Sequence, residues 1–438
     1  MEGAAEPSES MMKSLPYYKL LVLSAIIGVV AAVVVASFFW IVDNGQDLLW
    51  VELPKALGQG DYQDSPVLII SLCLIGGLLV GLITHFSKVK PVILQEELKE
   101  FNDDGRISPK KGIVGMIRGL VALLFGGSIG PEGPLVGGTA GLGTWLTERR
   151  KVPKQAVSVA TYAGISGMFG AFLGSPFASS VFTIEMSMNN KKNIGWLIII
   201  PGIVASTAAY AVFYTMTGFV FGSEYTFPPY DGLENIQLLY AIFLGLLGGA
   251  IGIFTIFLYR QMKRLAEPWT SKPIPLALLA GLILGLVGSV FPLALFDGAA
   301  EIQTIINDAV ELGIAMLLAL ALVKIILLCV CLSMGWTGGY IFPSFFIGAS
   351  VGLAVHLAFP FIPEVVCMVC LISGVAVALL RSPMALALIV AMMFQLTLTP
   401  VIAIAIVSSF ILTLGTSMVV EKEGIGPGYG LLGDRRKS

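Results

Sequence analysis

Residues 126–143 read GGSIGPEGPLVGGTAGLG and contain eight glycines, two prolines and one carboxylate, Glu132. Glycine and proline at this density interrupt a helix, because glycine lacks conformational restraint and proline lacks an N–H donor. The segments around this stretch are apolar. Within hydrocarbon, non-helical backbone is tolerated only where it is buried in protein or lines a wet cavity. If the chain lies in a membrane, the stretch therefore predicts a broken helix that faces a cavity.

The composition places the chain in a membrane. Of its 438 residues, 56% are hydrophobic and 12% are charged, and the mean hydropathy is +0.89. Soluble domains carry about a quarter charged residues. The net charge of −2 offers no general attraction to nucleic acid, and the chain has no basic arm. We expect an integral membrane protein whose partner is the lipid bilayer and not nucleic acid.

Apolar stretches of the roughly 20 residues that a bilayer span requires predict plain transmembrane helices. They lie at 19–42, 67–86, 194–217, 237–259, 274–296, 313–333 and 399–420. Between 112 and 188, and again between 338 and 396, glycine and proline cut the apolar sequence into pieces too short or too broken to be simple spans. The predicted fold class is an all-α integral membrane protein with many tilted and broken helices.

Loop charge predicts the orientation. Lys and Arg gather in the segments 87–118, 149–154, 191–192 and 260–272. By the positive-inside rule these segments are cytoplasmic. The acidic segments 43–66, 218–236 and 297–312, whose one basic residue is Lys55, fit the opposite side. Residues 1–18 then form a short cytoplasmic lead, because the first apolar run is too long for a signal-peptide core. The short termini and absent targeting signal favour a prokaryotic inner membrane.

The sequence repeats itself. One similar pair is ISGMFGAFLGSP at 165–176 and ISGVAVALLRSP at 372–383, which are offset by 382 − 175 = 207 residues. A second pair is Pro134 and Pro343, each of which opens a Gly-rich apolar helix; they are offset by 343 − 134 = 209 residues. Two features in the same order at nearly the same offset indicate a duplicated unit, although small-residue patterns also recur by chance in packed membrane helices. The expected halves are 19–220 and 221–420, followed by a tail at 421–438. Such repeats with interrupted helices are typical of transporters whose substrate site lies near the midplane.

The prolines suggest what the broken segments bind. Proline is favoured in the first turn of a helix, so Pro134 and Pro343 predict helix N-termini. A helix N-terminus presents unpaired N–H groups and about half a unit of positive charge. Two converging N-termini would bind an anion without a formal cation, and weakly enough to release it.

Glu132 precedes the first of these N-termini. Its carboxylate could occupy the anion position as a tethered competitor and leave when protonated, which would make it a pH-sensitive gate. The alternative is that Glu132 only caps its helix, as it would in a soluble protein. We favour the gate, because ionisable residues within membranes are usually functional.

The sequence resembles the CLC family of chloride channels and chloride/proton exchangers. GPEGP at 130–134 is similar to the family's Gly-Lys/Arg-Glu-Gly-Pro motif, and GGYIFP at 338–343 is similar to its Gly-Gly-x-Phe-x-Pro motif. The paired Ser-Pro helices and the tail GPGYGLL at 426–432 extend the resemblance over nearly the whole chain.

The resemblance implies an inverted repeat of broken helices and a homodimer with one anion pathway per subunit. It implies that Glu132 is the gating glutamate and that chloride or a similar anion is the bound substrate, with no cofactor. The implied anion contacts are the main-chain amides of Glu132, Gly133, Tyr340, Ile341 and Phe342 and the hydroxyl of Tyr429.

Two departures from the family concern the anion. The Gly-Ser-Gly-Ile-Pro motif, whose serine hydroxyl coordinates the anion, has no clean counterpart, and SKVKPVILQEEL stands in its expected place at 87–98. Anion selectivity is therefore left open. Pro131 replaces the family's basic residue before the glutamate, which removes a cation and one N–H donor and predicts weaker outer anion binding.

A third departure concerns protons. Exchangers of the family usually carry a second glutamate in a Phe-x-x-Glu-Glu stretch, whereas FTIEMS at 182–187 keeps Glu185 and places Met186 at the second position. Methionine carries no proton, so either Glu185 or water completes the proton pathway, or coupling is lost. Glu185 could instead simply end its helix beside Lys191 and Lys192.

Lys324 is a lone cation in an apolar helix. It could snorkel, pair with an acid, or add positive potential near the pathway.

The predicted function is transport of a small inorganic anion, most simply chloride. The protein could be a channel or a proton antiporter. The anion could instead be fluoride or nitrate, or the chain could carry a different substrate on a similar repeat of broken helices. No enzyme is expected, because the apolar segments hold no nucleophile–base pair. No metal site is expected either: His85 and His356 are far apart in sequence, and the five cysteines, including the Cys367-x-x-Cys370 pair, lie in apolar runs typical of buried small hydrophobic residues.

Overall fold

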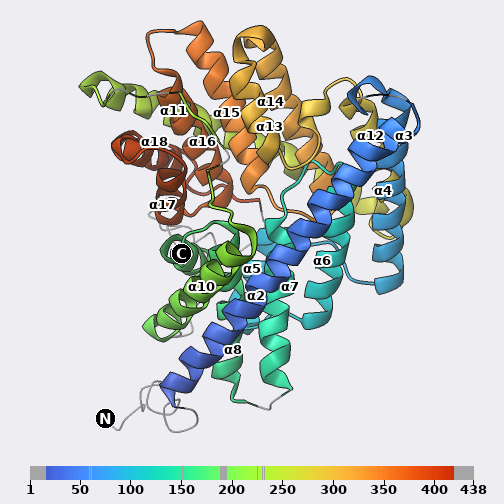
Figure 1. Ribbon diagram of the computed structural model, residues 1–438, viewed down its shortest axis with the longest axis vertical. Coiled ribbons are helices and arrows are strands. Elements are labelled where there is room, and N and C mark those ends of the chain that lie inside the picture. The colour runs from blue at the N-terminus through green and yellow to red at the C-terminus, as the bar shows by residue number, and fades with distance from the viewer. Residues whose placement is uncertain are drawn as a thin grey trace, which may run out of the picture.

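The computed structural model describes residues 16–58, 60, 62–149, 152–187, 195–223, 225–228, 230 and 232–418. Within these ranges the regular structure is helical, with a single isolated β-bridge (Figure 1). The predicted all-α class is confirmed. The tail and most of the N-terminal lead lie outside the described residues.

The first half of the chain contains helices of very different lengths. Its α-helices are α2 (Tyr17–Gln46), α3 (Leu53–Ala56), α4 (Pro66–Ser87), α5 (Leu94–Asp104), α6 (Pro109–Leu124), α7 (Glu132–Glu148), α8 (Lys154–Phe172), α9 (Pro176–Ser187) and α10 (Gly195–Thr217). A π-helical segment, η1 (Asp47–Glu52), joins α2 to α3, and a 3-10 turn, η2 (Tyr62–Asp64), precedes α4.

The second half is built in the same way. Its α-helices are α11 (Asn235–Ala266), α12 (Pro273–Gly288), α13 (Ala299–Asn307), α14 (Ala309–Ser333), α15 (Ile341–Ala358), α16 (Glu364–Leu380), α17 (Pro383–Met393) and α18 (Thr399–Leu412). The 3-10 turns are η3 (Glu267–Trp269), η4 (Pro292–Ala294) and η5 (Leu396–Leu398).

Six helical segments of the described chain are long and apolar enough to cross a bilayer. They are Tyr17–Ala56, Pro66–Ser87, Ile198–Thr217, Asn235–Trp269, Ala309–Ser333 and Ile341–Ala358. In Figure 1, α4 packs beside α12 at one edge of the molecule and α17 beside α18 at the opposite edge. The chain is therefore a multi-pass membrane protein, as its composition predicted.

Several predicted boundaries were wrong. The span expected at 274–296 stops at Gly288, where α12 ends, and the one expected at 399–420 stops at Leu412. The segment 87–118, read as a loop, contains α5 and most of α6. Helix α5 buries Leu94, Leu98 and Phe101 on one face of a polar sequence, which is the pattern of an amphipathic helix and not of a span. The acidic segment 297–312 contains α13 and the start of α14.

The two halves break their central helices in the same way. Helix α6 ends before Gly126, with φ 81°, and helix α14 ends before Gly335, with φ 97°. Both values lie in the left-handed region that glycine adopts without strain. The two glycines are 335 − 126 = 209 residues apart, the offset of the paired prolines.

The hydrogen bonds beyond these glycines also match. The Gly127 N–H donates to the Ala122 carbonyl at 2.8 Å, and the Trp336 N–H donates to the Cys331 carbonyl at 3.0 Å. Each closes the helix end in a Schellman arrangement. The chain then enters a short non-helical loop and starts α7 or α15, so Pro134 and Pro343 each occupy the first turn of a helix, as predicted.

Candidate functional site

The loops before α7 and α15 meet face to face. Gly130 N–H donates to the Gly339 carbonyl at 2.9 Å, and Gly339 N–H donates to the Gly130 carbonyl at 2.6 Å. The bridged residues are 339 − 130 = 209 apart, so equivalent glycines of the two repeats pair with each other. The reciprocal bonds satisfy backbone that would otherwise be unpaired, and they bring the N-termini of α7 and α15 together. The predicted convergence of the two N-termini is thus present.

The Glu132 side chain crosses from α7 to the other repeat. Glu132 is fully buried, and its Oε1 accepts a hydrogen bond from the Ile341 N–H at the first residue of α15. The Oε2 atom is buried without a partner. The carboxylate therefore occupies an anion position made by the N-terminus of a helix on the opposite repeat.

Two glycines shape the slot that holds this carboxylate. A Cβ atom at Gly130 would lie 2.0 Å from Glu132 Oε2, and one at Gly339 would lie 2.1 Å from Glu132 Cδ. These distances leave no room for a methyl group. Glycine at both positions lets the backbone approach the carboxylate closely.

We expect Gly133→Ala to destabilise the protein by about 1–3 kcal/mol, because its methyl group would lie 2.8 Å from the Gly338 carbonyl oxygen, and packed backbone cannot move aside as a side chain can. Thermal unfolding in detergent measures the change. Gly115→Ala is the matched control, because a Cβ there makes only ordinary contact, 3.7 Å from Glu97 Oε1. Equal stability of the two variants would show that the two loops pack less closely than described.

The other predicted amide donors lie at the same place. Gly133, in the first turn of α7, packs directly on the opposite loop, where a Cβ would be 2.8 Å from the Gly338 carbonyl oxygen. Phe342 is nearly buried in an aromatic cluster: its ring lies 5.4 Å from that of Phe172 and 6.1 Å from those of Phe221 and Phe345. This cluster fixes the first turn of α15. Tyr429 lies outside the described residues.

Glu185 is held in a structural position. Its two carboxylate oxygens accept hydrogen bonds from the Met384 and Ala385 N–H groups, both at 2.9 Å. These amides open α17, so Glu185 caps a helix of the other repeat and does not merely end its own. Nothing of the Met186 side chain, or of Lys191 and Lys192, falls within the described structure.

Glu185→Gln is expected to destabilise the protein by about 1 kcal/mol and to leave anion flux unchanged, because the amide keeps one acceptor but loses the charge at the α17 N-terminus. Chemical unfolding and an anion-flux assay test the two parts. Glu311→Gln, an exposed acid in the first turn of α14, serves as control. A large change in flux would argue that Glu185 acts in transport.

Lys324 is fully buried and does not snorkel. Its ammonium group donates to the carbonyls of Ala294, Leu295 and Phe296 at 3.3, 2.9 and 2.9 Å and lies 5.0 Å from the Phe346 ring centroid. Asp297 and Glu301, in α13 and the loop before it, act on Lys324 electrostatically, but neither forms a salt bridge with it. Its ammonium group is held by backbone carbonyls in the field of these acids, so the predicted pairing with an acid is not seen as a direct contact.

The segment that Lys324 bonds also contacts the loop before α7. Ser128 Oγ donates to the Ala294 carbonyl at 2.9 Å, and the Phe296 N–H donates to the Gly126 carbonyl at 3.3 Å. Lys324 therefore stabilises the segment 294–296, to which the loop before α7 is hydrogen-bonded.

Arg118 was misassigned to a cytoplasmic loop. It lies in α6 and is fully buried. Its guanidinium donates to the Thr337 and Thr84 hydroxyls and to the carbonyls of Val89 and Lys90. It thus ties the stretch that stands in place of the family's serine motif to the loop before α15. The sequence signal that could have indicated its burial was a single arginine inside an apolar run.

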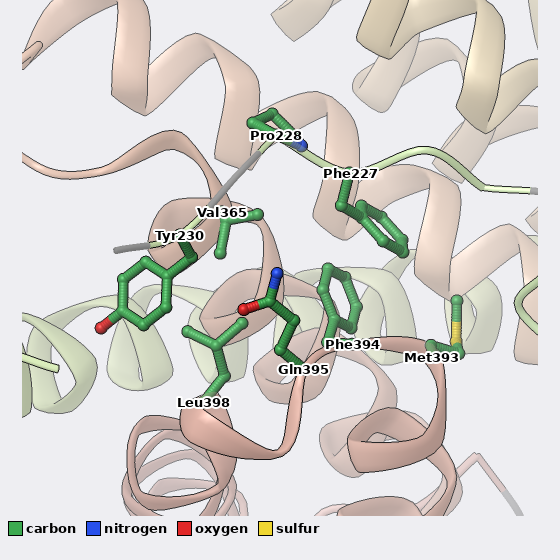
Figure 2. Close-up of a pocket in the computed structure, with 8 residues that line it drawn as sticks. All are labelled: Phe227, Pro228, Tyr230, Val365, Met393, Phe394, Gln395 and Leu398. Carbon is green, nitrogen blue, oxygen red and sulfur yellow. The ribbon is translucent and has the colours of Figure 1, made fainter. Parts of the chain in front are cut away.

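The outer pocket in Figure 2 is separate from these residues. It has a volume of about 310 Å³ and is lined by Phe227, Pro228, Tyr230, Val365, Met393, Phe394, Gln395 and Leu398. The Phe227 and Phe394 rings stack at 3.9 Å between centroids, and the Tyr230 hydroxyl is bonded to Gln237. Its walls are mostly apolar, with the amide of Gln395 among them, and none of the residues predicted to contact the anion lines it.

The fold and the paired N-termini agree with similarity to known proteins. The family model described as "Voltage gated chloride channel" matches residues 72–414. The chain belongs to this family of transporters and channels. It is 28% identical over 411 residues to the "Putative ion-transport protein YfeO" of Escherichia coli O1:K1, covering 92% of this chain and 94% of the relative. The protein of Escherichia coli strain UTI89 that carries the same name is also 28% identical.

Solved structures share the fold at 18% sequence identity. The "slow cyanobacterial Cl-/H+ antiporter" superposes with a TM-score of 0.77, covering 90% of this chain and 94% of the other. A "CLC-type fluoride/proton antiporter" gives 0.74, covering 92% and 97%. The predicted family and CLC-type fold are thereby confirmed.

Proposed function

We propose that this protein moves a small inorganic anion, chloride first among the candidates, across a membrane through the paired N-termini of α7 and α15. The observation that carries the proposal is the Glu132 carboxylate on the Ile341 amide. A side-chain anion held by backbone donors marks a position where a free anion can be held by the same donors. The donors carry partial charges only, so release remains fast.

Glu132 acts as the gate in this proposal. While ionised it competes with the transported anion for the Ile341 amide. Protonation removes its charge, and a neutral carboxyl group is a weaker acceptor, so the side chain leaves and the anion enters. The unpartnered Oε2 atom is consistent with a side chain that is not locked in place.

Proton coupling has support on both sides. The structural neighbours include two whose names describe proton antiporters. Against coupling, both oxygens of Glu185 are engaged at α17, and Met186 follows it. The second candidate is therefore passive anion transport with a glutamate gate. Fluoride or nitrate stays an alternative to chloride because the serine motif is missing.

The assembly and orientation are also proposals. Helices α9, α10, α17 and α18 lie together and expose large apolar side chains, among them Phe177, Met384 and Ile411, which suits a homodimer as well as lipid. The N-terminus is proposed to be cytoplasmic and the membrane to be a prokaryotic inner membrane.

Simultaneous anion and proton flux in vesicles tests the proposal. Purified protein is reconstituted, and chloride, fluoride and nitrate gradients are applied in turn while pH is recorded. Chloride movement supports the assignment, and chloride-driven proton uptake against a gradient establishes exchange. Chloride movement without protons selects the passive alternative. If only fluoride or nitrate moves, the chloride assignment is wrong, and if no anion moves, the proposed function is wrong.

A further inference from the structure

Tyr340 carries a hydroxyl group that the fold leaves without a partner. The residue precedes α15, its side chain is fully buried, and Oη makes no hydrogen bond. Buried tyrosine hydroxyls nearly always find a partner, because an unmade hydrogen bond in a low-dielectric interior is costly. The exception here lies at the candidate anion site, which suggests that the partner is the ligand.

Tyr340 adjoins the residue that holds the proposed gate. The N–H of Ile341, the next residue, donates to the Glu132 carboxylate. Glu132 and Glu96 also act electrostatically on the Tyr340 hydroxyl, and Glu96 Oε1 is paired with Lys263 Nζ at 2.7 Å. The unpartnered hydroxyl therefore belongs to a residue at the candidate anion position.

The stretch that replaces the serine motif offers no free hydroxyl of its own. Ser87 Oγ donates to the Thr84 carbonyl at 3.5 Å and accepts from the Val89 N–H at 3.2 Å. Thr84 Oγ1 donates to the Val80 carbonyl at 2.9 Å. Both side chains are committed to the end of α4.

Arg118 brings that stretch to the same place as Tyr340. Its guanidinium bonds the Val89 and Lys90 carbonyls on one side and the Thr337 hydroxyl, three residues before Tyr340, on the other. The stretch that lacks the serine is therefore tied to the loop that leads into Tyr340.

We propose that the Tyr340 hydroxyl donates a hydrogen bond to the transported anion and replaces the absent serine as a determinant of anion affinity and selectivity. This inference rests on the proposed function. When Glu132 leaves, the Ile341 N–H loses its acceptor, and it and the Tyr340 O–H are then both free to bind one small anion. The field of the α15 N-terminus favours a negatively charged partner at this point. One directional O–H donor favours compact, strong acceptors such as chloride and fluoride over nitrate.

The test is anion binding to full-length protein in detergent, measured by isothermal titration with chloride, fluoride and nitrate. Tyr340→Phe removes one oxygen atom and keeps the ring. We expect about tenfold weaker binding of chloride or fluoride, and a smaller loss for nitrate, because a hydrogen bond to an ion is lost. Tyr162→Phe is the matched control: this tyrosine is also buried, but its hydroxyl is bonded to the Ser180 carbonyl at 3.1 Å. It should bind anions as the wild type does.

Folding is separated from binding by recording the melting temperature of each variant with and without anion. If Tyr340→Phe cannot be isolated in a folded form, Tyr340→His, which has an N–H donor, is compared with Tyr340→Met, which has none. Wild-type affinity and selectivity in Tyr340→Phe would overturn the assignment of this hydroxyl and leave the proposed function standing. Lost proton coupling with unchanged anion affinity would also overturn it. A wild-type protein that neither binds nor moves an anion would refute both.

Discussion

Glu132→Gln is expected to make anion transport insensitive to pH and to abolish any movement of protons. Glutamine keeps the size of the side chain and an oxygen that can accept from the Ile341 N–H, but it has no charge and no proton to exchange. In the wild type, anion flux should rise as the pH falls, because protonation releases the tethered competitor. In the variant, flux should be high at every pH.

The size of the effect follows from the hydrogen bond. A bond to an ionised acceptor is worth roughly 1.5–3 kcal/mol, and a neutral one about 0.5–1.5 kcal/mol. The weaker competitor should therefore raise apparent anion affinity about tenfold, since each 1.4 kcal/mol is a factor of about ten. Flux from vesicles held between about pH 4.5, near the ordinary pKa of a glutamate, and about pH 8 measures both effects. Glu311→Gln, exposed at the start of α14, should keep the wild-type pH profile. If Glu132→Gln retains the wild-type pH profile, Glu132 is not the gate.

Lys324→Met is expected to destabilise the protein by about 3–5 kcal/mol, the largest stability effect among the substitutions considered, because it breaks a buried charge arrangement from one side. Methionine fills similar space, but the carbonyls of Ala294, Leu295 and Phe296 lose their donor. Asp297 and Glu301 lose the cation that acts on them.

A double-mutant cycle tests the cause of that loss. Adding Glu301→Gln should recover part of the stability, since it removes one uncompensated acid, so the double variant is more stable than the sum of the single changes predicts. Lys263→Met is the matched control: Lys263 pairs with Glu96 in a partly exposed bridge, and its loss should cost no more than about 1 kcal/mol. Equal losses at Lys324 and Lys263, measured by chemical unfolding, would contradict a larger contribution from the buried Lys324 ammonium group.

Local sequence features were enough for the main outline of the site. The density of glycine and proline at 126–143 predicted a break, the prolines predicted the starts of α7 and α15, and the 209-residue offset paired them. These features are local because helix ends are set by nearby φ/ψ preferences and missing donors. Gly130 and Gly339, which form the β-bridge, are separated by the same offset, so matching positions of the two halves are in direct contact.

Partners distant in sequence could not be predicted. Glu185 accepts from amides about 200 residues away. Lys324 bonds carbonyls of residues 294–296, a stretch beyond the end of α12 that was predicted to be the end of a transmembrane span. Arg118 stood at the edge of a basic run and was counted with it, although it is buried. Such pairings depend on which helices pack together, and a single sequence does not contain that information in its periodicity.

Competition between Glu132 and the transported anion for the N-terminus of α15 can be seen in crystals of Glu132→Gln and of the wild type, soaked in bromide and measured at the bromine absorption edge. We expect a bromide peak within hydrogen-bonding distance of the Ile341 nitrogen in the variant and a much weaker one in the wild type at neutral pH. Bromide bound in the variant with none at Ile341, or equal occupancy there in both proteins, would contradict it.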